Sequence, residues 1–89
     1  MFFVLIRHRV ADFSAWKKVY DAHLPFRQKA GLKENHVLHG ADDANEVVTL
    51  FSASDLDKVR EFAESADLRQ AMQKAGVIGR PEVSILEGG

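Results

Sequence analysis

The chain begins with an extended segment whose apolar side chains alternate with a period of two residues. On one side of residues 2–10, alternate positions hold Phe2, Val4, Ile6 and Val10. Phe3 and Leu5 point to the opposite side, so both faces of this predicted strand are apolar. Residues 46–52 form a second segment of this kind. Because such strands must be covered on both faces, we expect these two at the centre of a sheet.

Residues 12–23 instead follow the period of an amphipathic helix, with Asp12 placed to cap its N-terminus. The apolar arc of this helix consists of Phe13, Trp16, Val19, Tyr20, His23 and Leu24. Pro25 disfavours helical geometry at the residue before it, which predicts a break and then a further turn or two of helix up to Ala30. Gly31 is expected as the C′ residue that ends this segment.

Strands and a second helical region fill the rest of the chain. A second strand is expected at residues 32–39, and the polar turn 40–45 joins it to the strand at 46–52. In the helical region that follows, Ser54 is expected as the N-cap, and Asp57 completes an approximate capping box.

The last quarter of the chain completes the predicted order of elements. Ser65 indicates a second cap within the helical region, and Gly76 ends it. Residues 77–81 are expected to form a connector, which leaves 82–87 as the fourth strand. The order is therefore β-α-β-β-α-β, within one domain spanning residues 1–89.

Two right-handed βαβ crossovers place both helical regions on the same face of a four-stranded antiparallel sheet. The expected fold class is thus α+β, with the ferredoxin-like arrangement. The helices cover one face only, which leaves Phe3, Leu5 and half of the third strand exposed in a monomer. Soluble monomers rarely expose so large an apolar patch, so we expect a homodimer in which two sheets pack face to face.

Composition excludes several classes of partner and chemistry. Twelve basic residues against 13 acidic ones give a net charge of −1, which favours neither nucleic acid nor an anionic membrane. The absence of cysteine excludes disulfides, thiolate metal sites and cysteine nucleophiles. The apolar start lacks the pattern of a signal peptide, and no apolar run approaches the roughly 20 residues that span a bilayer. A cytoplasmic location is expected.

Several segments together resemble one protein family. These segments are DFSAWKKVYDAH at 12–23, DDANEV at 42–47, SADLRQAM at 65–72 and AGV at 75–77. They are similar to the small dimeric α/β-barrel proteins, above all to the bacterial and archaeal group described as cyclases or as antibiotic-biosynthesis-monooxygenase-like. The resemblance covers nearly the whole chain. It implies a ferredoxin-like homodimer and says little about activity, since most such proteins are uncharacterised.

Haem and metal are not expected. The same superfamily contains haem-binding members with a histidine on the second helix, whereas residues 55–75 contain none, which argues against haem held in that way. No HxH or HxxxH spacing, P-loop or GxGxxG motif is present, so neither a metal nor a cofactor is expected. The chain also departs from the family pattern at Ala44 and Ala66, where proline is frequent.

His23 is the first candidate for chemistry, because an imidazole on the apolar arc of a helix is unusual. With Trp16 and Tyr20 it is expected to border a space between helix and sheet, where the rings would stack on a planar ligand and move a proton. His23 and Tyr20 are therefore the expected catalytic residues. The alternative is a structural histidine bonded to a backbone carbonyl or to the helix end, and the sequence leaves both open.

The further candidates for lining a ligand pocket are Trp16, Arg27, His36, His39 and Phe51. His36 and His39 lie three residues apart on one strand and so face opposite sides, one toward the pocket and the other toward the dimer interface or solvent. Arg27 would hold an anionic or enolate oxygen if the helix persists past Pro25, although an exposed arginine is the commoner case. His8 is expected at the polar rim of the first strand.

Two functions of different class fit these residues. The first is a cofactor-independent cyclase or monooxygenase-like enzyme acting on a small aromatic or polyketide-like molecule, with a histidine as acid and base and Tyr20 or Arg27 polarising an oxygen. The second is a non-catalytic homodimeric module that binds a ligand or serves assembly. Several polar groups converging on one cavity would favour the first. A pocket filled by Trp16, Tyr20 and Phe51 would favour the second.

Overall fold

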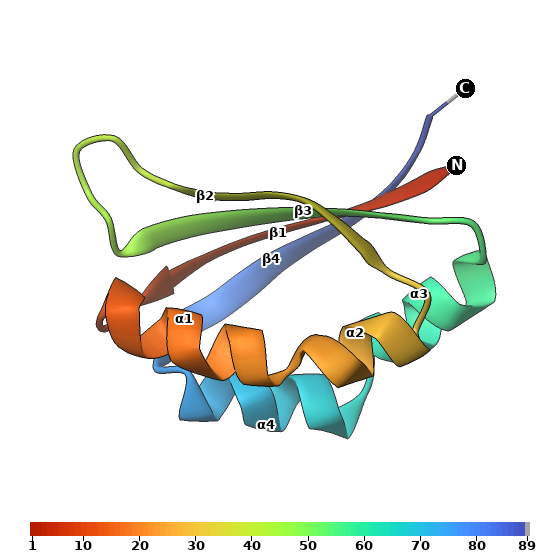
Figure 1. Ribbon diagram of the computed structural model, residues 1–89. Helices are drawn as coiled ribbons and strands as arrows, with labels where there is room; N and C mark the ends of the chain where they lie inside the picture. The colour runs from red at the N-terminus through yellow and green to blue at the C-terminus, as the bar shows by residue number, and fades with distance from the viewer. Residues whose placement is uncertain (89) are drawn as a thin grey trace.

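A four-stranded antiparallel sheet with helices on one face forms the framework of the molecule (Figure 1). The computed structural model describes residues 1–88. The strands are β1 (Phe2–Val10), β2 (Lys33–His39), β3 (Glu46–Ala53) and β4 (Val77–Glu87), in the spatial order β2-β3-β1-β4. The helices are α1 (Phe13–Ala22), α2 (Leu24–Lys29), α3 (Leu56–Ala63) and α4 (Ala66–Lys74). The predicted ferredoxin-like fold is confirmed, with β1 and β3 at its centre.

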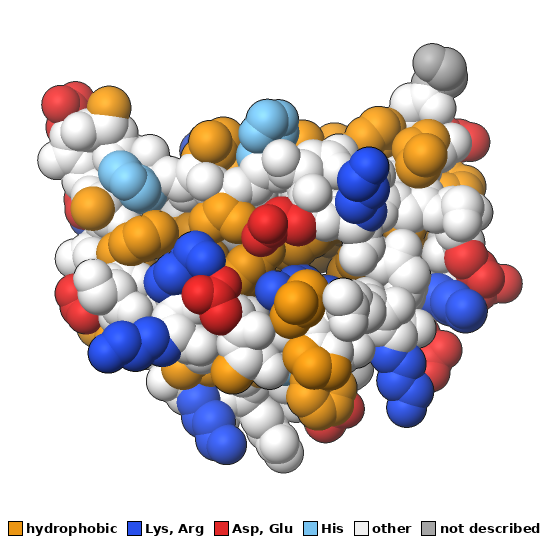
Figure 2. Space-filling view, viewed as in Figure 1, with side chains coloured by type: hydrophobic (Ala, Val, Ile, Leu, Met, Phe, Trp, Pro, Cys, Tyr) orange, Lys and Arg blue, Asp and Glu red, His pale blue; other side chains and the backbone are white. Residues whose placement is uncertain are grey.

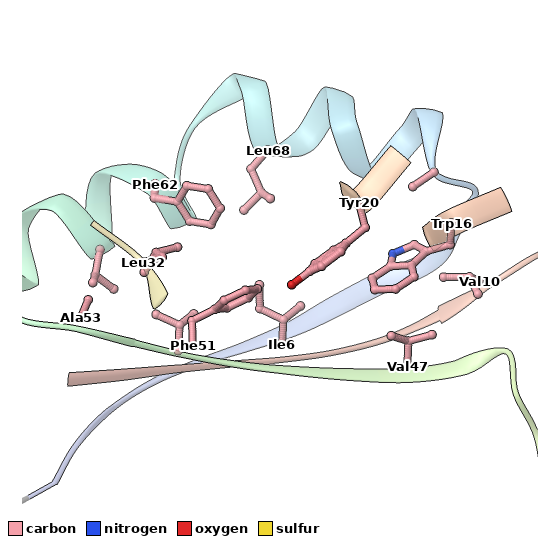
Figure 3. Close-up of a cluster of buried hydrophobic side chains, with 13 residues drawn as sticks. Ile6, Val10, Trp16, Tyr20, Leu32, Val47, Phe51, Ala53, Phe62 and Leu68 are labelled. Carbon is pink, nitrogen blue, oxygen red and sulfur yellow. The ribbon is translucent and has the colours of Figure 1, made fainter. Parts of the chain in front are cut away.

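Alternate residues of the two central strands face the helices and build the core. The register pairs Val4 with Phe51 and Ile6 with Thr49, so their inward side chains lie next to one another. Figure 3 shows Trp16 and Tyr20 above this surface. The buried apolar residues are Val4, Ile6, Val10, Trp16, Tyr20, Leu32, Val47, Phe51, Ala53, Val59, Phe62, Leu68 and Ala75.

The first helical region is divided where the sequence predicts a break. The Asp12 side chain accepts a hydrogen bond from the Ala15 N–H at 3.0 Å and so caps α1. His23 is both the C-cap of α1 and the N-cap of α2. Pro25 then lies in the first turn of α2, where its missing N–H would have no helical partner. Gly31 follows α2 with a φ of +76°, the left-handed conformation expected of a C′ glycine.

The predicted cap at Ser54 is wrong by one residue. Asp55 caps α3 instead, because its carboxylate accepts hydrogen bonds from the N–H groups of Asp57 and Lys58 at 3.0 and 3.2 Å. Ser54 and Asp55 are both good capping residues, and the charge of the aspartate adds a favourable interaction with the helix dipole. The cap predicted at Ser65 is confirmed, since its hydroxyl accepts from the Leu68 N–H at 3.1 Å.

Residues 77–81 belong to β4, and the prediction of a connector there is wrong. β4 pairs with β1 on both sides of a bulge, since the register shifts between Arg7 and Arg9 of β1. Gly79 has a φ of +72°, which suits a bulge residue. Pro81 is compatible with pairing because β4 lies at the edge of the sheet and need not donate on its outer side.

The sheet face opposite the helices is apolar, as the alternation in β1 and β3 predicts. The register places Phe3 beside Leu86, and Leu5 beside Leu50, on this face. Leu38 and Leu86 are 53% and 48% exposed. In Figure 2, hydrophobic side chains follow the upper edge of the molecule on this side of the sheet. None of the helices described is long and apolar enough to cross a membrane.

The cap at Asp55 leads to a stability prediction. Asp55→Ala should lower the free energy of unfolding by about 1 kcal/mol, because two N–H groups of α3 lose their acceptor. The neighbouring variant Ser54→Ala is the control and should change it by less than about 0.5 kcal/mol, since Ser54 is exposed and outside the helix. Urea unfolding measures both values. A larger loss of unfolding free energy in Ser54→Ala than in Asp55→Ala would contradict the assignment of the cap.

Candidate functional site

A cavity of about 50 Å³ lies between the sheet and the layer of helices. Aromatic side chains from α1 and β3 form much of its wall, and α4 closes the opposite side with aliphatic side chains and Met72. The polar side chains that line it are His8, Tyr20, His23, Arg27 and Thr49. Polar groups from two strands and two helices thus converge on one apolar space.

Trp16 and Tyr20 form the aromatic wall of the cavity. They lie on consecutive turns of α1, and their rings stack with centroids 4.8 Å apart and planes inclined by 20°. Phe51 of β3 extends this wall at 6.3 Å from the Tyr20 ring, with planes inclined by 27°. Figure 3 shows the three rings between the helices and the sheet. Surfaces of this kind favour a planar ligand.

Arg27 is a buried cation at one end of the aromatic wall, with only 6% of its surface exposed. Its guanidinium carbon lies 3.8 Å from the centre of the Tyr20 ring, and Nη1 donates a hydrogen bond to the Tyr20 carbonyl at 2.7 Å. Burial lowers the pKa of Arg27 below its ordinary value, but a guanidinium remains protonated at neutral pH. The break at His23 redirects the chain so that this residue of α2 points inward, in contrast to an exposed helix-end arginine.

The ring of Tyr20 lines the cavity, but its hydroxyl group is already engaged. It donates a 2.5 Å hydrogen bond to the carboxylate of Glu34 on β2. Burial, and then this hydrogen bond, raise the pKa of the phenol. Tyr20 therefore holds its proton firmly and directs it toward Glu34. To donate it to a ligand, Tyr20 would first have to break this bond.

Glu34 reaches Tyr20 because β2 contains a bulge. The register with β3 pairs Glu34 with Phe51 and His36 with Leu50, and it shifts between these two pairs. In a regular strand, Glu34 and His36 would share a face. The irregularity instead directs Glu34 toward the helices and His36 toward the open face of the sheet. Sequence alternation gives no signal of this change, so Glu34 was not among the candidate residues.

His8 lines the cavity, and the prediction that it lies at a polar rim is wrong. Only 8% of its surface is exposed, and its ring lies 5.5 Å from that of Trp16. Neither of its ring nitrogens has a hydrogen-bond partner among residues 1–88. Burial lowers the pKa of His8 from the usual 6.5, so the side chain is neutral at pH 7. Its place two residues after Ile6 and two before Val10 was the signal in the sequence.

His23 borders the cavity from the junction of α1 and α2, beside Trp16 and Tyr20. Its ring stacks on Phe26 with centroids 4.8 Å apart, and its Nε2 atom is buried without a hydrogen-bond partner in the part of the chain that is described. Burial, and then the charge of Arg27, lower its pKa. His23 also lines two outer grooves of about 470 and 210 Å³, so it separates the cavity from the surface.

The structure places neither His36 nor His39 around the cavity. They do face opposite sides of the sheet, as predicted, because His36 pairs with Leu50 and His39 with Val47. Both are exposed, and His39 packs its ring 5.1 Å from Phe13 at the rim of the helix layer. Their assignment to a ligand pocket thus has no support from the geometry. Within residues 1–88, no three His, Asp or Glu side chains gather closely enough to hold a metal ion.

Solved structures share this fold, although no protein-family model and no curated protein matches the sequence. One is a candidate antibiotic biosynthesis monooxygenase from Nitrosomonas europaea, with 16% identity, 99% of this chain and 98% of that chain covered, and a TM-score of 0.75. A second, from Bordetella bronchiseptica and described in the same way, has 12% identity, coverage of 99% and 96%, and a TM-score of 0.79. A third is SnoaB from Streptomyces nogalater, a cofactor-independent oxygenase, with 15% identity, coverage of 99% and 92%, and a TM-score of 0.78.

These similarities extend over the whole chain in both directions. They confirm that this chain has the fold of the antibiotic-biosynthesis-monooxygenase-like proteins, which is the fold that the resemblance in the sequence implies. At identities of 12–16% they do not transfer individual site residues.

The burial of His8 leads to a prediction about pH. Because its pKa is lower in the folded than in the unfolded chain, the unfolded state binds more protons, and stability should fall as pH drops below 6.5. His8→Phe should reduce this fall, leaving a part caused by His23. At pH 7 the free energy of unfolding of the variant should equal that of the parent or exceed it by up to about 1 kcal/mol, because an unpaired polar group is removed. Urea unfolding from pH 5 to 8 tests this, and equal acid losses in both proteins would contradict it.

Proposed function

We propose that the cavity is the active site of a cofactor-independent oxygenase acting on a small, planar aromatic or enolisable molecule. The observation that carries this proposal is the convergence of a neutral, unpaired imidazole (His8) and a buried guanidinium (Arg27) on one aromatic cavity. A base and a fixed cation in a site of low dielectric favour removal of a proton and stabilise the resulting anion. The shared fold with SnoaB, described as a cofactor-independent oxygenase, supports the same reaction class.

The proposed chemistry needs no external reductant. Loss of a proton from an activated CH₂ group gives a delocalised carbanion, whose electrons reduce O₂ to form a carbon–hydroperoxide bond. Loss of water from the hydroperoxide gives a ketone, so that R₂CH₂ and O₂ become R₂C=O and H₂O. The substrate supplies all four electrons that reduce O₂. The protein has to bind the substrate, accept and return a proton and stabilise the anion.

The size of the cavity sets a condition on this proposal. Sites for drug-sized ligands commonly have volumes of about 300–1,000 Å³, compared with about 50 Å³ here. The α4 side is the place where the cavity can widen, because Met72 is flexible and only partly buried. The small volume also favours the alternative function, a non-catalytic module whose aromatic side chains simply fill its core.

Oxygen uptake and ligand binding separate these two functions. The protein is mixed with hydroquinone, 1,3-dihydroxynaphthalene and anthrone, and O₂ consumption is followed together with the fluorescence of Trp16, the only tryptophan. We expect catalysed O₂ uptake with at least one compound, unaffected by a metal chelator. Arg27→Met should lower kcat/KM by about 100-fold, as expected for loss of a group that stabilises an anion.

The control variant for this assay is Leu24→Ala, which removes an exposed side chain of α2 that lies outside the cavity. It should leave O₂ uptake unchanged. Quenching of Trp16 fluorescence without O₂ uptake would support the ligand-binding module instead. The absence of both quenching and O₂ uptake with all three compounds would contradict a small-molecule site.

We further propose that the protein is a cytoplasmic homodimer that packs the helix-free faces of two sheets together. This face carries apolar side chains from all four strands, among them Phe3, Leu5, Leu38, Leu50 and Leu86. Burial of such surface contributes roughly 25 cal/mol per Å², and a second copy presents a surface of the same shape and chemistry. The absence of cysteine fits a reducing compartment.

The dimer predicts a particle of twice the 10.0 kDa chain mass in light scattering at micromolar concentration. Leu5→Asp should shift the population toward monomer, because it places a charge in the centre of the proposed interface. Leu24→Asp, which places the same charge on an exposed position of the helix layer, should leave the mass unchanged. A parent protein that stays monomeric would overturn this proposal.

A further inference from the structure

The cavity has a neutral imidazole and a cation beside different rings of its aromatic wall. The centroids of the His8 and Trp16 rings are 5.5 Å apart, and those of Trp16 and Tyr20 are 4.8 Å apart. The guanidinium carbon of Arg27 lies 3.8 Å from the centroid of the Tyr20 ring. His8 is thus a neighbour of Trp16, and Arg27 is a neighbour of Tyr20. Figure 3 shows Tyr20 between Trp16 and Phe51.

We propose that His8 is the catalytic base that removes the proton from the substrate and that Arg27 binds the oxyanion formed at the other end of the conjugated system. This inference rests on the proposed function and assigns its two central roles. In the step, the C–H electron pair of the substrate passes into its conjugated system, the carbonyl oxygen gains the negative charge, and a ring nitrogen of His8 gains the proton. The imidazolium later returns this proton to the peroxide oxygen.

The other polar residues of the cavity are less suited to act as the base. The Tyr20 phenol is bonded to Glu34 and holds its proton. His23 stacks on Phe26 and borders the outer grooves, so its ring stands at the boundary of the cavity. His8 is more deeply buried than His23, and both of its nitrogens lack partners among residues 1–88. It can therefore accept a proton without breaking an existing hydrogen bond.

The charges around His8 fit this role. The titratable or charged groups that share the cavity with it are Tyr20 and His23 at α1 and its end, and Arg27 on α2. The side chains that α4 and β3 contribute to the cavity are uncharged. Burial alone lowers the pKa of His8, so the free base predominates at neutral pH. After proton transfer, the imidazolium and Arg27 both stabilise the anion that lies between them.

The placement of the two groups favours one kind of substrate. His8 neighbours the Trp16 ring, whereas Arg27 lies over the Tyr20 ring. A substrate whose acidic carbon and charge-bearing oxygen lie on opposite sides of a conjugated ring would suit two groups placed beside different rings of the wall.

Hydrogen–deuterium exchange without oxygen tests this assignment separately from oxygenation. Anthrone carries its CH₂ group and its carbonyl across one ring, and its exchange in D₂O under nitrogen is followed by proton NMR. We expect the protein to accelerate exchange, and His8→Gln to slow the catalysed rate by about 100-fold or more. The catalysed rate should rise with pH, with its midpoint below the usual histidine pKa of 6.5 because burial lowers the pKa of His8, and this rise should be absent in His8→Gln.

Variants of four residues make the test specific. His8→Ala should regain exchange when imidazole is added, a rescue that a purely structural histidine would not show. Arg27→Met should raise the pKa of a bound phenol, read from phenolate absorbance, by about one unit or more. Leu24→Ala is the control and should exchange at the parent rate. A loss of exchange in His23→Gln, with His8→Gln still active, would overturn the assignment of the base.

The outcomes distinguish this inference from the proposed function. O₂ uptake or exchange that persists in a folded His8→Gln overturns the role of His8 and leaves the oxygenase proposal standing. Exchange that depends on His8, without O₂ uptake by the parent protein, supports the base and overturns oxygenation. Absence of both activities in the parent protein overturns both.

Discussion

The stack of Trp16 and Tyr20 beneath α1 is the contact on which the site depends. Two large rings on consecutive turns hold the helix away from β1 and β3, with centroids 4.8 Å apart. Neighbouring elements place polar side chains against this stack. His8 of β1 lies beside Trp16, and Arg27 of the short helix α2 lies over Tyr20. An aliphatic pair at these positions would allow closer packing and leave no flat wall.

The polar groups around this stack differ in how well they are compensated. The Arg27 guanidinium lies over the Tyr20 ring and donates a hydrogen bond to the Tyr20 carbonyl. The Tyr20 hydroxyl donates a hydrogen bond to the Glu34 carboxylate. His8 has no hydrogen-bond partner within residues 1–88, and such a group costs about 1–3 kcal/mol. Domains of this size are stable by only about 5–15 kcal/mol. Phenylalanine would fill the same place without this cost, which supports the proposed role of His8 as a base.

Alternation and capping rules predict most of the fold, because each strand and helix of this chain obeys its own local period. The errors have local causes. Ser54 and Asp55 are equivalent caps by composition, and Gly79 and Pro81 suggest a loop although they form a bulge in an edge strand. Of the residues predicted to border a pocket, Trp16, Tyr20, His23, Arg27 and Phe51 line the cavity, and their functional roles stay predictions. Glu34 depends on a bulge, which a two-residue period cannot reveal. His8 shares the inward face of Ile6 and Val10, which indicates burial and not the polar rim that was predicted.

The two faces of β1 connect the site with the opposite surface of the sheet. Ile6 and His8 point to the cavity, while Leu5, the residue before Ile6, lies on the open face. Leu5 and His8 belong to the same strand, so a displacement of β1 would move both side chains. In the proposed homodimer, packing against the open face would restrict β1 and thereby the imidazole, as the proposed role of His8 requires. The proposed assembly and the proposed chemistry would then be connected through one strand.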